Sequence, residues 1–173
     1  MWTRVGYTGG RTADPTYRAL GDHSEAVQIG YDPSVISYER LLTEFFAAHD
    51  PRGEPWSRQY RSAIFVVDAA ERRAAELSLR AAEKRLGEPV STAIEQAGTF
   101  TRAEDYHQKY ELRHVGPVWA ELTAAYPDLD DLLRSTAAAR MNAYAGGYLP
   151  QDQLPVDQLG LSPRARDVLI QLR

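Results

Sequence analysis

The chain has 173 residues, of which 43% are hydrophobic and 25% charged, a formal net charge of −4 and no cysteine. This length predicts one domain, or one domain with an appended subdomain, which folds without a disulfide or a metal. The composition excludes thiolate catalysis and thiolate metal sites within these residues, and it gives no reason to expect nucleic acid or a membrane as a partner. No apolar stretch reaches the ~18 residues that span a bilayer and no signal-peptide pattern opens the chain, so we expect a cytoplasmic protein.

Alternating and helical hydrophobic patterns predict the elements of the first hundred residues. Residues 11–22 are polar and punctuated by glycine and proline, which predicts a loop. Ser37 is placed to cap one helix, and Asp68 with Glu71 to cap another, with Gly87 just past its end. The expected strands cover 3–7, 24–31, 62–67 and 90–95, and the expected helices cover 38–49 and 69–86.

The order of these elements predicts an α+β fold, in which helices pack on a mixed β-sheet. From Ala103 onward every pattern is helical, with candidates at 103–114, 117–125, 128–144 and from 162. We therefore expect an α+β domain over residues 1–114 and a helical C-terminal extension over residues 115–173 that packs on it.

Glu25 is the most informative single residue. In the predicted strand it shares a face with Val27, Ile29 and Tyr31. Burial on an apolar face disfavours the charged form of a carboxyl, and a protonated carboxyl can donate a hydrogen bond or a proton. The alternative is a solvent position at the first residues of the strand, and the residues alone favour this second interpretation.

Aromatic residues on predicted turns and strand ends are the next candidates. Tyr7, Tyr17 and Tyr60 carry phenols, which hydrogen-bond a polar oxygen without adding charge, and Trp56 lies in a loop that could line a pocket. Aromatic rings also suit a small S-methyl group. Because the chain has ten tyrosines, each of them is expected more often to be a core residue than a site residue. The four histidines form no ligand pattern, so neither a metal nor another cofactor is expected.

A series of short motifs over residues 3–114 resembles the A class of peptide methionine sulfoxide reductases, which act on the S epimer. The resemblance implies a two-layer α+β sandwich and the reduction of methionine sulfoxide in protein repair after oxidative stress. The tail around 138–148 looks like a helical extension found in a longer bacterial subgroup. The motifs occur in family order: Val5-Gly6-Tyr7-Thr8-Gly9-Gly10, Asp14-Pro15-Thr16-Tyr17, His23-Ser24-Glu25, His49-Asp50-Pro51, Gln59-Tyr60-Arg61-Ser62 and Ala103-Glu104-Asp105-Tyr106-His107-Gln108.

The resemblance also implies roles for individual residues. Glu25 matches the family's glutamate that donates a proton to the sulfoxide oxygen, and this match favours a site role for it. Tyr17 and Tyr60 match two tyrosines that bind this oxygen or line the methyl pocket. Glu54 is the candidate to replace an aspartate of the family's loop after His-Asp-Pro. The expected substrate-binding residues are Tyr7, Trp56, Glu54 and His107.

The family's Gly-Cys-Phe-Trp segment, which carries the nucleophilic thiol, is absent from the sequence. One interpretation is that the native product is longer and is a reductase. A thioredoxin-type reductant is then an expected partner, but only if an upstream cysteine exists. The others are a cysteine-free pseudoenzyme that binds methionine sulfoxide or another methyl sulfoxide, a repurposed acid–base enzyme using Glu25 and Tyr60, and a structural subunit completed by a partner. A sheet that lacks its first strand exposes an edge, so we expect a homodimer or a second chain to cover it.

Overall fold

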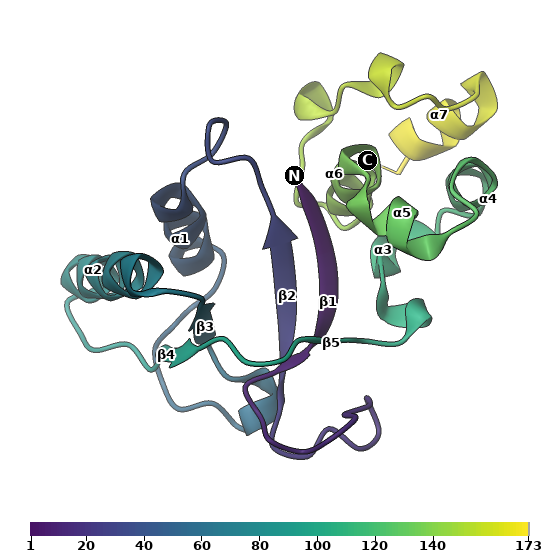
Figure 1. Cartoon of the computed structure of the whole chain (residues 1–173). Helices are drawn as coiled ribbons and strands as arrows, with labels where there is room; N and C mark the ends of the chain where they lie inside the picture. Colours follow the sequence, from purple (N-terminus) through teal and green to yellow (C-terminus); the bar gives the residue numbers. More distant parts are fainter. Residues whose placement is uncertain (173) are drawn as a thin grey trace. The chain divides into compact units, whose positions relative to one another are not determined.

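The computed structural model describes residues 1–172, and its α+β architecture agrees with the fold class expected from the sequence (Figure 1). The strands and α-helices are β1 (Trp2–Thr8), β2 (Ser24–Gly30), α1 (Tyr38–Ala47), β3 (Ala63–Val66), α2 (Ala69–Leu86), β4 (Ala93–Gln96), β5 (Thr101–Arg102), α3 (Tyr110–Arg113), α4 (Gly116–Ala125), α5 (Leu129–Arg134), α6 (Thr136–Ala145) and α7 (Pro163–Ile170). Short 3-10 helices are η1 (Arg58–Tyr60), η2 (Asp105–His107), η3 (Gln151–Gln153) and η4 (Val156–Gln158).

The chain forms two compact units. The sheet unit comprises residues 6–26 and 31–103, and the helical unit comprises residues 1–5, 27–30 and 104 onward. The strands β1 and β2 each have residues in both units. The domain boundary expected after residue 114 stays a prediction.

The strands form two small sheets, one with an antiparallel pair and the other parallel. In the first, the order is β2-β1-β5, and β1 pairs antiparallel with β5 in the register Gly6↔Arg102. In the second, β3 and β4 are parallel, from Ala63↔Ala93 to Val66↔Gln96. The two-residue strand β5 has no counterpart among the predicted strands, because two residues carry no alternation to detect.

Helix α1 begins, and helix α2 both begins and ends, at the predicted signals. The Ser37 hydroxyl accepts a hydrogen bond from the backbone N–H of Arg40, and the Asp68 carboxylate accepts from the first turn of α2. Gly87 ends α2 in the left-handed conformation, at φ 76°. These caps fix the two helices that cover the β3–β4 pair, and the buried side chains of this core are Leu42, Phe46, Ile64, Val66, Ala75 and Ala82.

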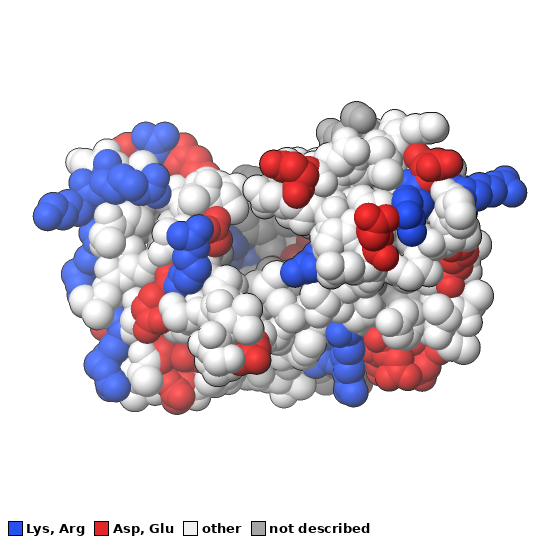
Figure 2. All heavy atoms as spheres, turned by 90° about the horizontal axis from the view of Figure 1, so that it is seen from above, with Lys and Arg blue, Asp and Glu red and all other residues white. Residues whose placement is uncertain are grey.

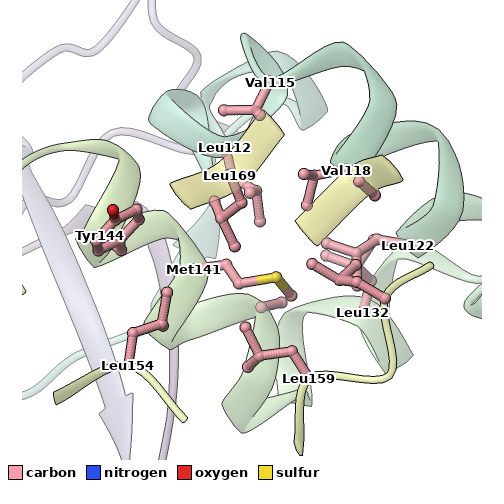
Figure 3. Close-up of a cluster of buried hydrophobic side chains, with 13 residues drawn as sticks. Leu112, Val115, Val118, Leu122, Leu132, Met141, Tyr144, Leu154, Leu159 and Leu169 are labelled. Carbon is pink, nitrogen blue, oxygen red and sulfur yellow. The ribbon is translucent and has the colours of Figure 1, made fainter. Parts of the chain in front are cut away.

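The helical unit has its own hydrophobic core, shown in Figure 3. Met141 and Tyr144 of α6 are fully buried in it, together with side chains from α3, α4, α5 and α7. Two helices expected as continuous are interrupted: 103–114 at Lys109, which adopts φ 52°, and 128–144 at Ser135. The Ser135 hydroxyl accepts from the backbone N–H of Ala138, so this residue caps a new helix.

Lys109 is buried, with only 5% of its surface exposed. Its ammonium donates to the backbone oxygen of Thr3 at 2.8 Å and to the Thr3 hydroxyl at 2.7 Å. Burial lowers the pKa of Lys109 to about 8, because neutral oxygens replace the water lost by a cation. This lysine ties the first residues of β1 to the start of α3.

Acidic and basic side chains intermix over the face seen in Figure 2, in keeping with the small net charge. Along α2, for example, Glu71, Glu76 and Glu83 alternate with arginines and a lysine. No helix among residues 1–172 is both long and apolar enough to cross a membrane.

Candidate functional site

The loop between β1 and β2 is closed by Asp22. Its carboxylate accepts the backbone N–H groups of Arg11 at 2.9 Å and Thr12 at 3.0 Å, and the Thr12 hydroxyl at 2.8 Å. These hydrogen bonds, those of the Thr12 and Arg11 N–H groups first, hold the pKa of Asp22 well below its usual range. Asp22 therefore stays ionised and keeps the loop closed at neutral pH.

We expect Asp22→Asn to loosen this loop, because a neutral amide oxygen is a weaker acceptor than a carboxylate. Amide hydrogen exchange of Arg11 and Thr12 should speed up, whereas Asp152→Asn, at an exposed position of η3, should leave it unchanged. Since the folded-state pKa is lowered, the contribution of Asp22 is complete above its ordinary pKa of 3.8 and disappears as the pH falls through the folded value. Unchanged exchange in Asp22→Asn would contradict this assignment.

His23 is a second cross-link of the same loop and is buried. Its Nε2 lies 2.8 Å from the backbone oxygen of Thr12, so Nε2 carries the hydrogen and donates. Its Nδ1 accepts the backbone N–H of Gly10 at 3.3 Å. These two bonds are those of a neutral imidazole, and they fix the backbone immediately before Glu25.

Glu25 lies on β2 with its side chain exposed. The predicted alternation is confirmed, because Ser24 is fully buried while Val27, 58% exposed, and Ile29 share the outward face with Glu25. The solvent position that the residues alone favour for Glu25 is therefore correct, and the alternative of a buried apolar face is wrong. Strand periodicity identifies residues that share a face but not which face is covered, and the covered side here is that of Ser24.

Arg61 holds the covered side of β2 to the second sheet. Its Nε donates to the Ser24 hydroxyl at 2.8 Å, and that hydroxyl donates to the backbone oxygen of Arg58 at 2.8 Å. The Arg61 guanidinium also binds Glu95 of β4 through both carboxylate oxygens. This bidentate bond lowers the pKa of Glu95. The network fixes η1 beside β2.

Arg58, at the other end of η1, anchors the same segment to the loop. Its Nε donates to the backbone oxygen of Asp22 at 2.6 Å, and a terminal nitrogen donates to the backbone oxygen of Gly9 at 2.9 Å. Gly9 has φ 80°, and a Cβ there would lie 2.5 Å from the Phe65 ring, so this position requires glycine. Both arginines thus hold η1, and the residues between them are presented to Glu25.

These residues complete a compact polar cluster. The Gln59 side-chain nitrogen donates to Glu25 Oε1 at 2.7 Å and to the Tyr60 hydroxyl at 3.0 Å. Tyr60 is hydrogen-bonded to Tyr17, and its ring stacks on Trp56, with centroids 4.6 Å apart. Desolvation raises the pKa of Tyr60, and the bond to Tyr17 and the charge of Glu25 raise it further. The phenol therefore stays protonated and able to donate.

The structure thus brings together Glu25, Tyr17, Tyr60 and Trp56. Of the other predicted site residues, Tyr7 is buried within β1, with 2% of its surface exposed, and Glu54 is exposed in the loop before η1. His107 belongs to the helical unit, where its ring lies 4.2 Å from that of Tyr106. The site roles of these three residues stay predictions.

Sequence reasoning gave no role to Gln59, Arg58 or Arg61. The available signal was the motif Gln59-Tyr60-Arg61-Ser62, in which only the tyrosine was assigned a function. Among residues 1–172, no group of three His, Asp or Glu side chains is placed to hold a metal ion. The cluster instead offers hydroxyl and carboxyl groups to a polar oxygen, next to an exposed aromatic pair that suits a small apolar group.

The chain is similar to known families and proteins over most of its length. The family model of peptide methionine sulfoxide reductase matches residues 1–134. A reductase A5 from Oryza sativa is 44% identical over 83% of the chain and 58% of its own length, and one from Drosophila melanogaster is 38% identical over 95% and 67%. The crystal structure of reduced Mxr1 from Saccharomyces cerevisiae has a TM-score of 0.58 and 29% identity, and covers 62% of this chain and 68% of that chain.

The chain spans 58% and 60% of the lengths of the plant relatives, from Oryza sativa and Arabidopsis thaliana. The relatives that match 83–95% of it come from plants and a fly, so its place in a bacterial subgroup stays a prediction. All these relatives bear the name of a reductase, which gives no support to the alternative of a pseudoenzyme. The match over residues 1–134 places the chain in the peptide methionine sulfoxide reductase family.

Proposed function

We propose that the cluster binds the sulfoxide group of peptide methionine-(S)-sulfoxide and that the chain acts in its reduction to methionine. The observation that carries this proposal is the convergence of Glu25, Tyr17 and Tyr60, which supplies two phenols and a carboxyl for one oxygen atom. A sulfoxide oxygen is a strong acceptor without a formal charge, so neutral donors suit it better than a lysine or an arginine.

Reduction breaks the S–O bond, and the oxygen leaves as water after taking up two protons and two electrons. Glu25 is the group placed to deliver a proton, while Tyr17 and Tyr60 hydrogen-bond the oxygen as its charge grows. Trp56, 82% exposed and stacked on Tyr60, offers an apolar surface for the S-methyl group. Tyr7, Glu54 and His107 remain candidates for contacts with the rest of the substrate.

The electrons require a thiolate, and none of the 173 residues is a cysteine. We therefore place the thiol outside these residues, in an upstream Gly-Cys-Phe-Trp segment of a longer cytoplasmic product. A thioredoxin-type reductant would regenerate that thiol. If no such upstream segment exists, the exposed face of β2 is the surface that a homodimer or a second chain would cover.

We expect N-acetyl-methionine-(S)-sulfoxide to bind the 173-residue chain and to bind Tyr60→Phe and Tyr17→Phe about 3- to 10-fold more weakly, which is the effect of one lost hydrogen bond. Glu25→Gln keeps a neutral donor at the same place, so its affinity should change less. Isothermal titration calorimetry measures these constants, with N-acetylmethionine as the ligand that lacks the oxygen.

Tyr148→Phe, at an exposed tyrosine of the helical unit, is the matched control and should bind like the wild type. The proposed function is wrong if the wild-type chain does not distinguish the sulfoxide from N-acetylmethionine. It is also wrong if the Tyr17, Tyr60 and Tyr148 variants all retain wild-type affinity.

A further inference from the structure

The Gln59 side chain connects the carboxyl group of the cluster, on Glu25, to its phenols through Tyr60. Its side-chain nitrogen carries two hydrogens, and the two acceptors within reach are Glu25 Oε1 at 2.7 Å and the Tyr60 hydroxyl at 3.0 Å. The reverse orientation of the amide would place its carbonyl oxygen against the carboxylate of Glu25. In the structure the amide is oriented so that it donates to both neighbours.

We propose that Gln59 is a positioning residue of this site, whose amide decides which oxygen of Glu25 carries the proton and where the Tyr60 hydroxyl points. This inference rests on the proposed function, because it assigns the residue that prepares the same donors. The amide N–H occupies Oε1 of Glu25, so a proton on this carboxyl is held on Oε2. Oε2 is then the atom that gives the proton to a substrate oxygen.

The effect on Tyr60 follows from the same bond. Because the Tyr60 oxygen accepts a hydrogen from Gln59, its own hydrogen is directed to another acceptor. The Tyr60 hydroxyl is also hydrogen-bonded to Tyr17, and this bond contributes to the raised pKa of Tyr60. Tyr60 thus links the Gln59 amide to Tyr17, the second phenol of the cluster. Because connected hydrogen bonds polarise one another, the Gln59 amide acts on both phenols.

The backbone around Gln59 is built to keep this amide in place. Arg58 is bound to two backbone oxygens of the β1–β2 loop, and Arg61 is bound to Ser24 and Glu95. Gln59 lies between these two anchored residues in η1 and is itself partly buried. A side chain on a segment fixed at both ends loses little further freedom when it bridges its neighbours.

The test uses Gln59→Met, which keeps the length of the side chain and removes both donors. Titration of tyrosines labelled with ¹³C at the ring ζ carbon, assigned with Tyr60→Phe, should show the pKa of Tyr60 shifted upward, because the Gln59 bond favours the phenolate. The carboxyl carbon resonance of Glu25 should also move. Affinity for N-acetyl-methionine-(S)-sulfoxide should fall about 3- to 10-fold, by the loss of ordered donors.

Gln96→Met is the matched control, because the Gln96 amide donates to the backbone oxygen of Val67. It should leave the Tyr60 titration, the Glu25 resonance and the affinity unchanged. If Gln59→Met behaves like Gln96→Met in the two spectroscopic readouts, the positioning role is overturned. These readouts need no sulfoxide, so failure of the wild-type chain to bind the ligand would count against the proposed function alone.

A second measurement, in proteins that keep Gln59, covers the case in which Gln59→Met does not fold. The side-chain ¹H–¹⁵N resonances of Gln59 should shift in both Glu25→Gln and Tyr60→Phe, because each variant alters one of its two partners. Resonances of Gln59 that stay in place in both variants would also overturn the inference.

Discussion

Replacing Arg61 with methionine is expected to lower the free energy of unfolding by about 3 kcal/mol. The substitution leaves the Glu95 carboxylate without its bidentate partner and the Ser24 hydroxyl without a donor. Removing one member of a buried ion pair costs about 3–5 kcal/mol, and the lower end applies because the side chain of Glu95 is 33% exposed while that of Arg61 is 10% exposed. Urea denaturation followed by circular dichroism measures the change.

Arg52→Met is the matched control, because Arg52 forms exposed ion pairs with Asp50 and Glu88. Such pairs contribute about 0–1 kcal/mol, so the control should be almost as stable as the wild type. The double variant Arg61→Met/Glu95→Met should regain part of the loss, since it leaves no unpaired charge. Equal losses in Arg61→Met and Arg52→Met would show that the Arg61 network does not stabilise the fold.

The pH dependence of this network has a definite sign. The hydrogen bond from Arg61 lowers the pKa of Glu95, so its contribution is complete above the ordinary glutamate pKa of 4.5. The contribution is lost as the pH falls through the lower folded-state value. The stability difference between the wild type and Arg61→Met should therefore shrink in acid.

Lys109 is expected to make the protein more stable in alkaline solution. Its folded-state pKa of about 8 lies below the ordinary value of 10.5, so the unfolded chain binds more protons between these pH values, and stability rises with pH there. Because a pKa difference of one corresponds to about 1.4 kcal/mol, the full rise is about 3 kcal/mol. Below pH 8 the cost of burying the charge is constant.

Lys109→Met should abolish this rise, because methionine has similar length and no titrating group. Tyrosines also titrate in this range, so the informative quantity is the difference in unfolding free energy between wild type and variant at pH 7, 9 and 10.5. The control is Lys84→Met, which changes the chain's other lysine, exposed near the end of α2. Parallel pH curves for the wild type and Lys109→Met would mean that the burial of this amine has no energetic consequence.

Local signals in the sequence were sufficient for the elements whose ends carry a cap. Ser37, Asp68 and Gly87 act within one turn of their own positions, and the helices that they delimit were predicted within a few residues. The break at Lys109 has no such signal, since a lysine with positive φ is held by distant hydrogen bonds to Thr3. Ser135 did carry a signal, but a strong helical pattern on both sides concealed it.

The candidate site could be predicted only in part, for a related reason. Tyr17, Tyr60 and Glu25 are far apart in sequence, and the motif resemblance rather than any periodicity indicated that they converge. The exposure of Glu25 depends on which face of β2 is covered, which Ser24 and Arg61 decide through contacts across 37 residues of sequence. The bridging role of Gln59 depends on side-chain geometry that a motif does not specify.

The hydrophobic core of the helical unit extends past the last residue that the family model matches. The family model ends at Arg134, but Leu112, Leu122 and Leu132, which precede that residue, are buried in one cluster with Met141, Leu159 and Leu169, which follow it. A gene shortened at the end of the family model would keep every position that the model matches, but it would encode apolar helix faces without the residues that bury them. For this protein, the end of the family model is therefore not a safe place to define a domain boundary.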